Sequence, residues 1–68
     1  MSELIFVVEE SVEGGLIARA LGESIFTQAT DIASLRTQVR DAMQAHFDAG
    51  KAPKMIRLHY VRDEVIAA

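Results

Sequence analysis

The sequence predicts a small α/β (α+β) domain with the element order βββαβ. Three observations support this prediction: a continuous apolar run at residues 4–8, apolar residues at three- and four-residue spacing over 31–49, and an alternating segment at 55–61. These patterns are typical of a central strand, an amphipathic helix and a half-buried strand, respectively. A chain of 68 residues that is 50% hydrophobic and 25% charged suits a single globular domain over residues 1–68.

The first three strands are predicted to form an antiparallel meander. We expect them at about 3–10, 16–21 and 24–28, where short runs rich in branched and aromatic side chains are separated by turn residues. Gly14 and Gly15 stand in the first turn, where glycine readily adopts the positive φ that a tight hairpin requires.

The helix is predicted from about Asp31 to Ala49. Asp31 can accept hydrogen bonds from the free N–H groups at the helix start, and its charge suits the positive end of the helix dipole. Gly50 and Pro53 follow, as is common beyond a helix C-terminus. The apolar face is expected to carry Ile32, Leu35, Val39, Ala42, Met43 and His46.

The fourth strand, 55–61, is predicted to lie parallel to the first, which gives the sheet order 3-2-1-4. A right-handed crossover through the helix produces this arrangement. One helix covers only one face of such a sheet, and an uncovered apolar face indicates a binding partner. The apolar residues expected on the uncovered face are Ile5, Val7, Ile17, Ile25 and Val61.

Composition excludes several classes of protein. The chain has no cysteine, so it has neither disulfides nor thiolate metal sites. A net charge of -3 argues against direct nucleic-acid binding, which normally uses a basic surface. The first apolar run is too short for a signal peptide or a membrane span, so we expect a cytoplasmic protein with no membrane contact. An acidic chain suits a basic protein partner.

No catalytic, cofactor or metal site is predicted. Glu9, Glu10 and Glu13 lie close together in sequence, but general acid catalysis requires a carboxyl group whose pKa is raised by burial, and a strand end and turn are hydrated. His46 and His59 have no further ligand at a recognised metal spacing. We therefore expect a protein without enzymatic activity.

The residues predicted to bind a partner are Glu9, Glu10 and Glu13 near the first hairpin, and the outward-facing Arg57 and His59 on the last strand. Acidic residues at such an edge would mainly increase the rate of association with a basic protein. Because a chain this short builds only a small core and has no disulfides, we also expect a homodimer, formed through the uncovered sheet face or an edge strand.

The chain resembles the N-terminal domain of the HicB-like antitoxin family. The resemblance is carried by the segments at 6–10, 13–18, 26–31 and 32–35, with Ala29 where that family usually has Gly. It implies a βββαβ fold and a protein partner, the small basic RNA-cleaving toxin HicA. No helix-turn-helix or ribbon-helix-helix pattern follows in this sequence, so we expect no operon repression.

Two alternatives to a toxin partner remain. One is an orphan homodimeric domain with an unknown ligand. The other is a subunit associated with an enzyme, because the segment at 57–67 resembles short chains labelled as a branched-chain 2-oxo acid dehydrogenase subunit. A domain of 68 residues cannot enclose the thiamine-diphosphate site of such an enzyme, so the chain itself would not be the catalyst.

Overall fold

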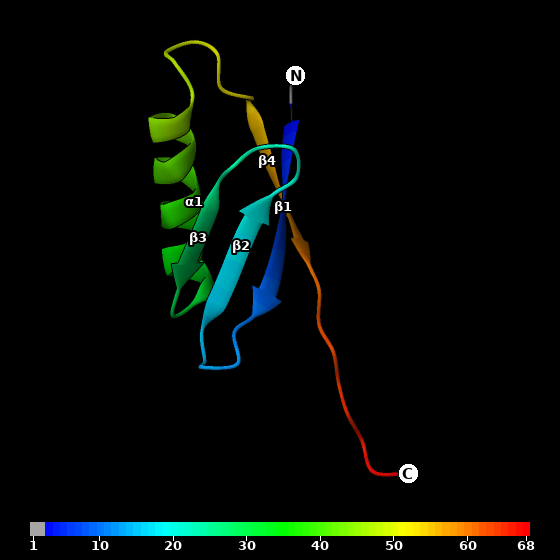
Figure 1. Ribbon diagram of the computed structural model, residues 1–68. Coiled ribbons are helices and arrows are strands. Elements are labelled where there is room, and N and C mark those ends of the chain that lie inside the picture. Colours follow the sequence, from blue (N-terminus) through cyan, green and yellow to red (C-terminus); the bar gives the residue numbers. More distant parts are fainter. Residues whose placement is uncertain (1–2) are drawn as a thin grey trace.

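The computed structural model describes residues 3–68 and shows one helix packed on a four-stranded sheet (Figure 1). The elements are β1 (Glu3–Glu10), β2 (Leu16–Ala20), β3 (Phe26–Ala29), α1 (Ile32–His46) and β4 (Met55–Tyr60). The sheet order is β3-β2-β1-β4, with β1 antiparallel to β2 and parallel to β4. The predicted βββαβ order, sheet order and strand directions are confirmed.

Alternation along β1 separates the two faces of the sheet. Leu4, Phe6 and Val8 are at most 2% exposed and face the helix, whereas Ile5 and Val7 between them are half-buried on the opposite face. The apolar run therefore does form a central strand, but residues 3–68 cover only one side of it. The second apolar side remains available for another contact.

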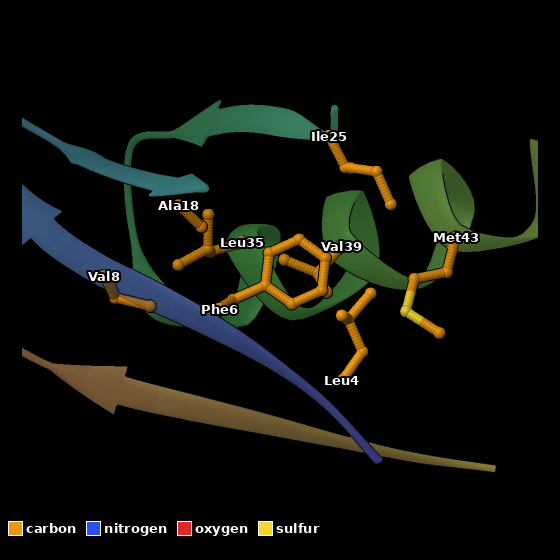
Figure 2. Packing of buried hydrophobic residues seen from close by; sticks show 8 residues of the cluster. All are labelled: Leu4, Phe6, Val8, Ala18, Ile25, Leu35, Val39 and Met43. Carbon is orange, nitrogen blue, oxygen red and sulfur yellow. The ribbon is translucent and has the colours of Figure 1, made fainter. Parts of the chain in front are cut away.

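The core lies between β1 and α1, with Phe6 near its centre (Figure 2). Leu35, Val39 and Met43 come from successive turns of the helix and are all buried. Ala18 and Ile25 close the core from the β2 and β3 side. The predicted apolar face of the helix is therefore confirmed for Leu35, Val39 and Met43. Ile32 and Ala42 are half-buried, and the prediction for His46, which is exposed, is wrong.

The helix begins where predicted and ends earlier. Asp31 is the N-cap, and its Oδ1 accepts a hydrogen bond from the Ser34 N–H at 2.8 Å. The predicted end at Ala49 is wrong: the last helical residue is His46, and Phe47 is extended at φ -101° and ψ 146°. Phe47 packs against the core, and its N–H donates to the carbonyl of Met43 as the chain leaves the helix. Gly50, with φ 78°, belongs to the loop that follows.

The predicted position of Ile25 on the uncovered face is wrong. Ile25 is 6% exposed and belongs to the core, and its carbonyl accepts a hydrogen bond from the Ala20 N–H. It shares its face with Thr27, so the intervening Phe26 points the other way and is 62% exposed. The physical reason is the alternation itself, which places the aromatic ring outside.

The helix covers the sheet unevenly. It packs over β3 and β2, and β4 at the far edge lies beyond it (Figure 1). Consequently Ile56 and Leu58, although on the helix side of β4, are only half-buried, and Tyr60 on the same side is 53% exposed. After Val61, the segment 62–68, called the tail below, extends away from the sheet (Figure 1).

Candidate protein-binding surface

The face of the sheet opposite α1 is called the open sheet face below. Strand registers place alternate residues of all four strands on it. They are Glu3, Ile5, Val7, Glu9, Ile17, Arg19, Phe26, Gln28, Met55, Arg57 and His59. In the part of the chain that the structure describes, no helix covers this face (Figure 1).

The centre of the open sheet face is apolar. Ile5, Val7 and Ile17 are half-buried by their neighbours, and Phe26 and Met55 at the two edge strands are each 62% exposed. Arg19 stands between Val7 and Phe26 in the strand registers, so apolar and charged side chains alternate across the face. Exposed apolar side chains set among charged ones are a feature of protein interfaces.

Two ion pairs border this apolar centre. Arg57 donates to Glu3 through Nε–Oε1 at 2.8 Å and Nη2–Oε2 at 3.0 Å, a two-point contact between β4 and β1. Arg19 Nη2 lies 3.8 Å from Glu9 Oε1, across β2 and β1. Hydrogen bonding to Arg57 lowers the pKa of Glu3, and the same contact raises the pKa of Arg57. Both pairs are solvent-exposed and contribute little to stability.

Glu3 and Asp31 give the fold a defined acid sensitivity. The side-chain hydrogen bond from Arg57 lowers the pKa of Glu3, and the backbone hydrogen bond from Ser34 lowers the pKa of Asp31. Each carboxylate therefore contributes stability that is present above its ordinary pKa, 4.5 for Glu3 and 3.8 for Asp31, and is lost as the pH falls through the lowered value.

We expect the melting temperature to fall as the pH is lowered below these ordinary values, and to fall less in the variant Asp31→Asn. Asparagine caps a helix about as well as aspartate does, but it does not titrate. The substitution therefore keeps the cap and removes the contribution of Asp31 to the pH dependence of stability. Circular dichroism melts between about pH 2.5 and pH 7 measure this difference. An acid response identical to that of the wild type would show that Asp31 does not contribute to it.

The structure brings together only part of the predicted binding set. Glu9, Arg57 and His59 lie on the open sheet face, with His59 beside Val7 of β1. Glu10 points to the helix side, where its Oε1 lies 3.8 Å from Arg62 Nε, and Glu13 is exposed in the turn. Glu9, Glu10 and Glu13, called the acidic hairpin below, lie at one end of the sheet, with Glu9 on the open sheet face and Glu10 on the helix side.

Sequence reasoning missed three residues of this surface. Glu3 accepts two hydrogen bonds from the guanidinium of Arg57, so a partner would meet an ion pair and not a free arginine at this position. Arg19 likewise forms an ion pair with Glu9. Among the Phe and Tyr rings of residues 3–68, that of Phe26 is the most exposed. Alternation from Thr27 could have placed Phe26 outside, but the two ion pairs depend on strand registers that the sequence does not specify.

Within the described range 3–68, no three His, Cys, Asp or Glu side chains come together as metal ligands. His46 Nε2 lies 3.0 Å from Glu23 Oε1, away from the open sheet face. Where β1 and β4 end, Glu9, Glu10 and Asp63 line a shallow hollow of about 260 Å³. No helix described by the structure is long and apolar enough to cross a membrane.

Two curated proteins are similar in sequence. A UPF0150 protein of Archaeoglobus fulgidus is 50% identical over 52 residues, which is 76% of this chain and 77% of the relative. A UPF0150 protein of Thermotoga maritima is 40% identical over 65 residues, 96% of this chain and 91% of the relative. No protein-family model and no solved structure matches the chain.

Proposed function

The chain belongs to the UPF0150 family, and within that family we propose that it is a protein-binding module whose open sheet face and acidic hairpin bind a basic protein. The observation that carries this proposal is the apolar centre of the face, which the acidic hairpin borders at one end. Apolar burial would provide the affinity, and the three carboxylates would select a positively charged partner and speed its approach.

Burial on the open sheet face supports a flat contact. Phe26 and Met55 each have most of their surface in water, and aromatic residues and methionine are enriched at the centres of protein interfaces. Ile5 and Val7 lie between them on β1. A partner that lies across all four strands would cover these side chains together and remove their apolar surface from water.

Charge supports a basic partner. The chain has a net charge of -3, and Glu10 and Glu13 are exposed. Arg57, Arg19 and Arg62 pair with Glu3, Glu9 and Glu10, so each pair is close to neutral. Glu13 is the acidic-hairpin residue that has no ion pair among residues 3–68. The resemblance to HicB-like antitoxins gives such a partner a concrete form, a small basic RNA-cleaving toxin that the module would neutralise by covering it.

We expect the variant Glu9→Lys/Glu10→Lys/Glu13→Lys to lose its basic partner while remaining folded. Each affinity-tagged form would be produced in the organism that encodes the protein and recovered under gentle conditions, with copurifying proteins identified by mass spectrometry. Reversing three carboxylates at this end of the sheet places like charges against the partner, which lowers the association rate strongly and weakens the complex.

The matched control is Asp41→Lys/Asp48→Lys, which reverses exposed carboxylates on the helix and beyond it. This variant should recover the same partner as the wild type. If the acidic-hairpin variant recovered as much partner as the wild type, the hairpin would not be part of the binding site. Circular dichroism would check that each variant is folded.

A second candidate function is self-association. It is favoured by the edge strand β4, whose helix side is incompletely covered, and by the exposed apolar residues of the tail, Val65 at 95% and Ile66 at 76%. An uncovered edge strand offers unpaired backbone groups to another chain. A homodimer formed there would leave the open sheet face accessible.

A further inference from the structure

We propose that two copies of this chain exchange their tails, each tail adding as a fifth strand along the free edge of β4 in the other copy. The proposal rests on the self-association candidate above and not on the basic partner. The exchanged tail would fill a groove between α1 and β4 that residues 3–68 leave uncovered.

The groove lies where the helix fails to cover the sheet. It has a volume of about 220 Å³, with Val39, Ile56 and Leu58 as its apolar floor and Arg36 and Arg40 at its rim. Neither arginine has an ion-pair partner among residues 3–68. The groove therefore presents apolar surface beside two unpaired positive charges.

The tail has the complementary composition. Asp63 and Glu64 immediately precede Val65 and Ile66, and both apolar side chains are almost entirely in water. None of these four residues makes an ion pair or a side-chain hydrogen bond within the described range 3–68. In an extended tail, alternate residues share one side, so one acid and one branched apolar residue can meet the two arginines and the apolar floor.

Length and backbone geometry also fit strand addition. Residues 62–68 span roughly 23 Å when extended, and the six residues of β4 span about 20 Å, so one tail can run along one β4 edge. In the order β3-β2-β1-β4, β4 pairs only with β1, which leaves the backbone groups on its other side for a new strand.

The tail of a second copy is the occupant that fits best, because the segment 61–68 has no glycine for a two-residue hairpin turn back onto β4. To pair with its own β4, the tail would need a hairpin turn directly after Val61, and two-residue hairpins require positive φ. In residues 3–68, positive φ occurs only at glycines, the last of which is Gly50. An exchange about a two-fold axis needs no turn. Each tail continues in the direction of its own β4 and pairs with β4 of the other copy.

Alternation predicts how the tail would sit. Ile56, Leu58 and Tyr60 point to the helix side, so a tail that continues the pleat of β4 directs Glu64 and Ile66 to that side. Ile66 would then lie on the apolar floor of the partner copy, and Glu64 would approach the arginines at the rim. Asp63 and Val65 would extend the open sheet face.

The test is a charge exchange between two variants. Variant one, Arg36→Glu/Arg40→Glu, has an acidic groove and its natural tail. Variant two, Asp63→Lys/Glu64→Lys, has its natural groove and a basic tail. In each homodimer every tail meets a groove of like charge, which should raise the dimer Kd by about tenfold or more and shift the observed mass from two chains to one.

Mixing the two variants should restore a dimer, because in the mixed pair both tails meet grooves of opposite charge. Native mass spectrometry and sedimentation equilibrium identify the mixed species, and a chain with all four substitutions should dimerise with itself. The control Gln38→Glu/Lys51→Glu adds negative charge at exposed positions outside the groove and should remain dimeric.

Three outcomes would overturn the exchange: a wild type that is monomeric, variants that dimerise as well as the wild type, or folded variants that stay monomeric when mixed. The second would place the dimer contact elsewhere, and the third would indicate a tail held by its own chain. Variant one leaves the acidic hairpin unchanged, so it should still capture the basic partner. Loss of the exchange and loss of that partner are thus separate results.

Discussion

Replacing Phe6 by alanine is expected to cause the largest loss of stability of the substitutions considered, and to remove about half of the free energy of unfolding. Phe6 is 0% exposed and lies at the centre of the core, between the helix and the middle strand of the sheet (Figure 2). Truncating a buried phenylalanine costs about 3–5 kcal/mol, because transfer free energy is lost and a cavity is left. A domain of this size has a total stability of about 3–10 kcal/mol, so the loss consumes a large part of it.

The matched control is Phe26→Ala, the same substitution at a ring that is 62% exposed on the open sheet face. It removes little buried surface and should leave the free energy of unfolding within about 1 kcal/mol of the wild type. Urea unfolding followed by circular dichroism measures both variants. If Phe6→Ala were as stable as Phe26→Ala, the core would not be centred on β1.

Gly15→Ala is expected to have the second-largest effect. Gly15 has φ +81°, and a Cβ built there would lie 2.6 Å from the carbonyl oxygen of Ala29 on β3. Since the contacting atom belongs to the backbone, β2 and β3 would have to separate at this end. We expect a loss of about 1–3 kcal/mol from this overlap, added to the strain of positive φ, which costs about 1–2 kcal/mol.

Gly14→Ala separates these two costs. Gly14 has a similar φ of +94°, but beyond its immediate neighbours in the chain no atom lies within 4 Å of the place where a Cβ would stand, so this variant has only the conformational strain. The difference in unfolding free energy between the two variants, again from urea unfolding, isolates the close approach of β2 to β3. Equal losses in both variants would contradict the packing at this hairpin.

Local patterns predicted most of the fold. The run at 4–8 identified β1 as the central strand, and the alternation at 56–60 gave the sidedness of β4. The helix start followed from Asp31, whose capping hydrogen bond the structure contains. The sheet order followed from general rules of chain connection, because a crossover helix after a meander leaves few arrangements.

The errors arose where tertiary packing outweighed local signals. Gly50 was predicted to end the helix, but the chain already leaves it at Phe47, which packs against the core. Ile25 was assigned to the uncovered face because alternation along the third strand separates Ile25 from Phe26 but does not say which of them faces the helix. The strand begins at Phe26, and the side chain preceding it points into the core.

The candidate surface was predictable in outline but not in its contacts. The uncovered apolar face was predictable because a sheet has two faces and the single predicted helix can cover only one of them. The pairing of Glu3 with Arg57 joins residues 54 positions apart and depends on the parallel register of β1 and β4. Likewise, the spacing of Arg36 and Arg40 along the helix predicted only a solvated surface. That they line a groove together with Ile56 and Leu58 depends on how α1 packs beside β4.

The central claim is that the open sheet face and the acidic hairpin bind a basic protein partner. Native mass spectrometry of the untagged protein, recovered gently from the organism that encodes it, tests this claim most directly because it reports the composition and stoichiometry of the complex. The account predicts a heteromeric complex with a small protein of positive net charge. A monomer or a homodimer alone, under conditions in which other complexes of that organism survive, would contradict it.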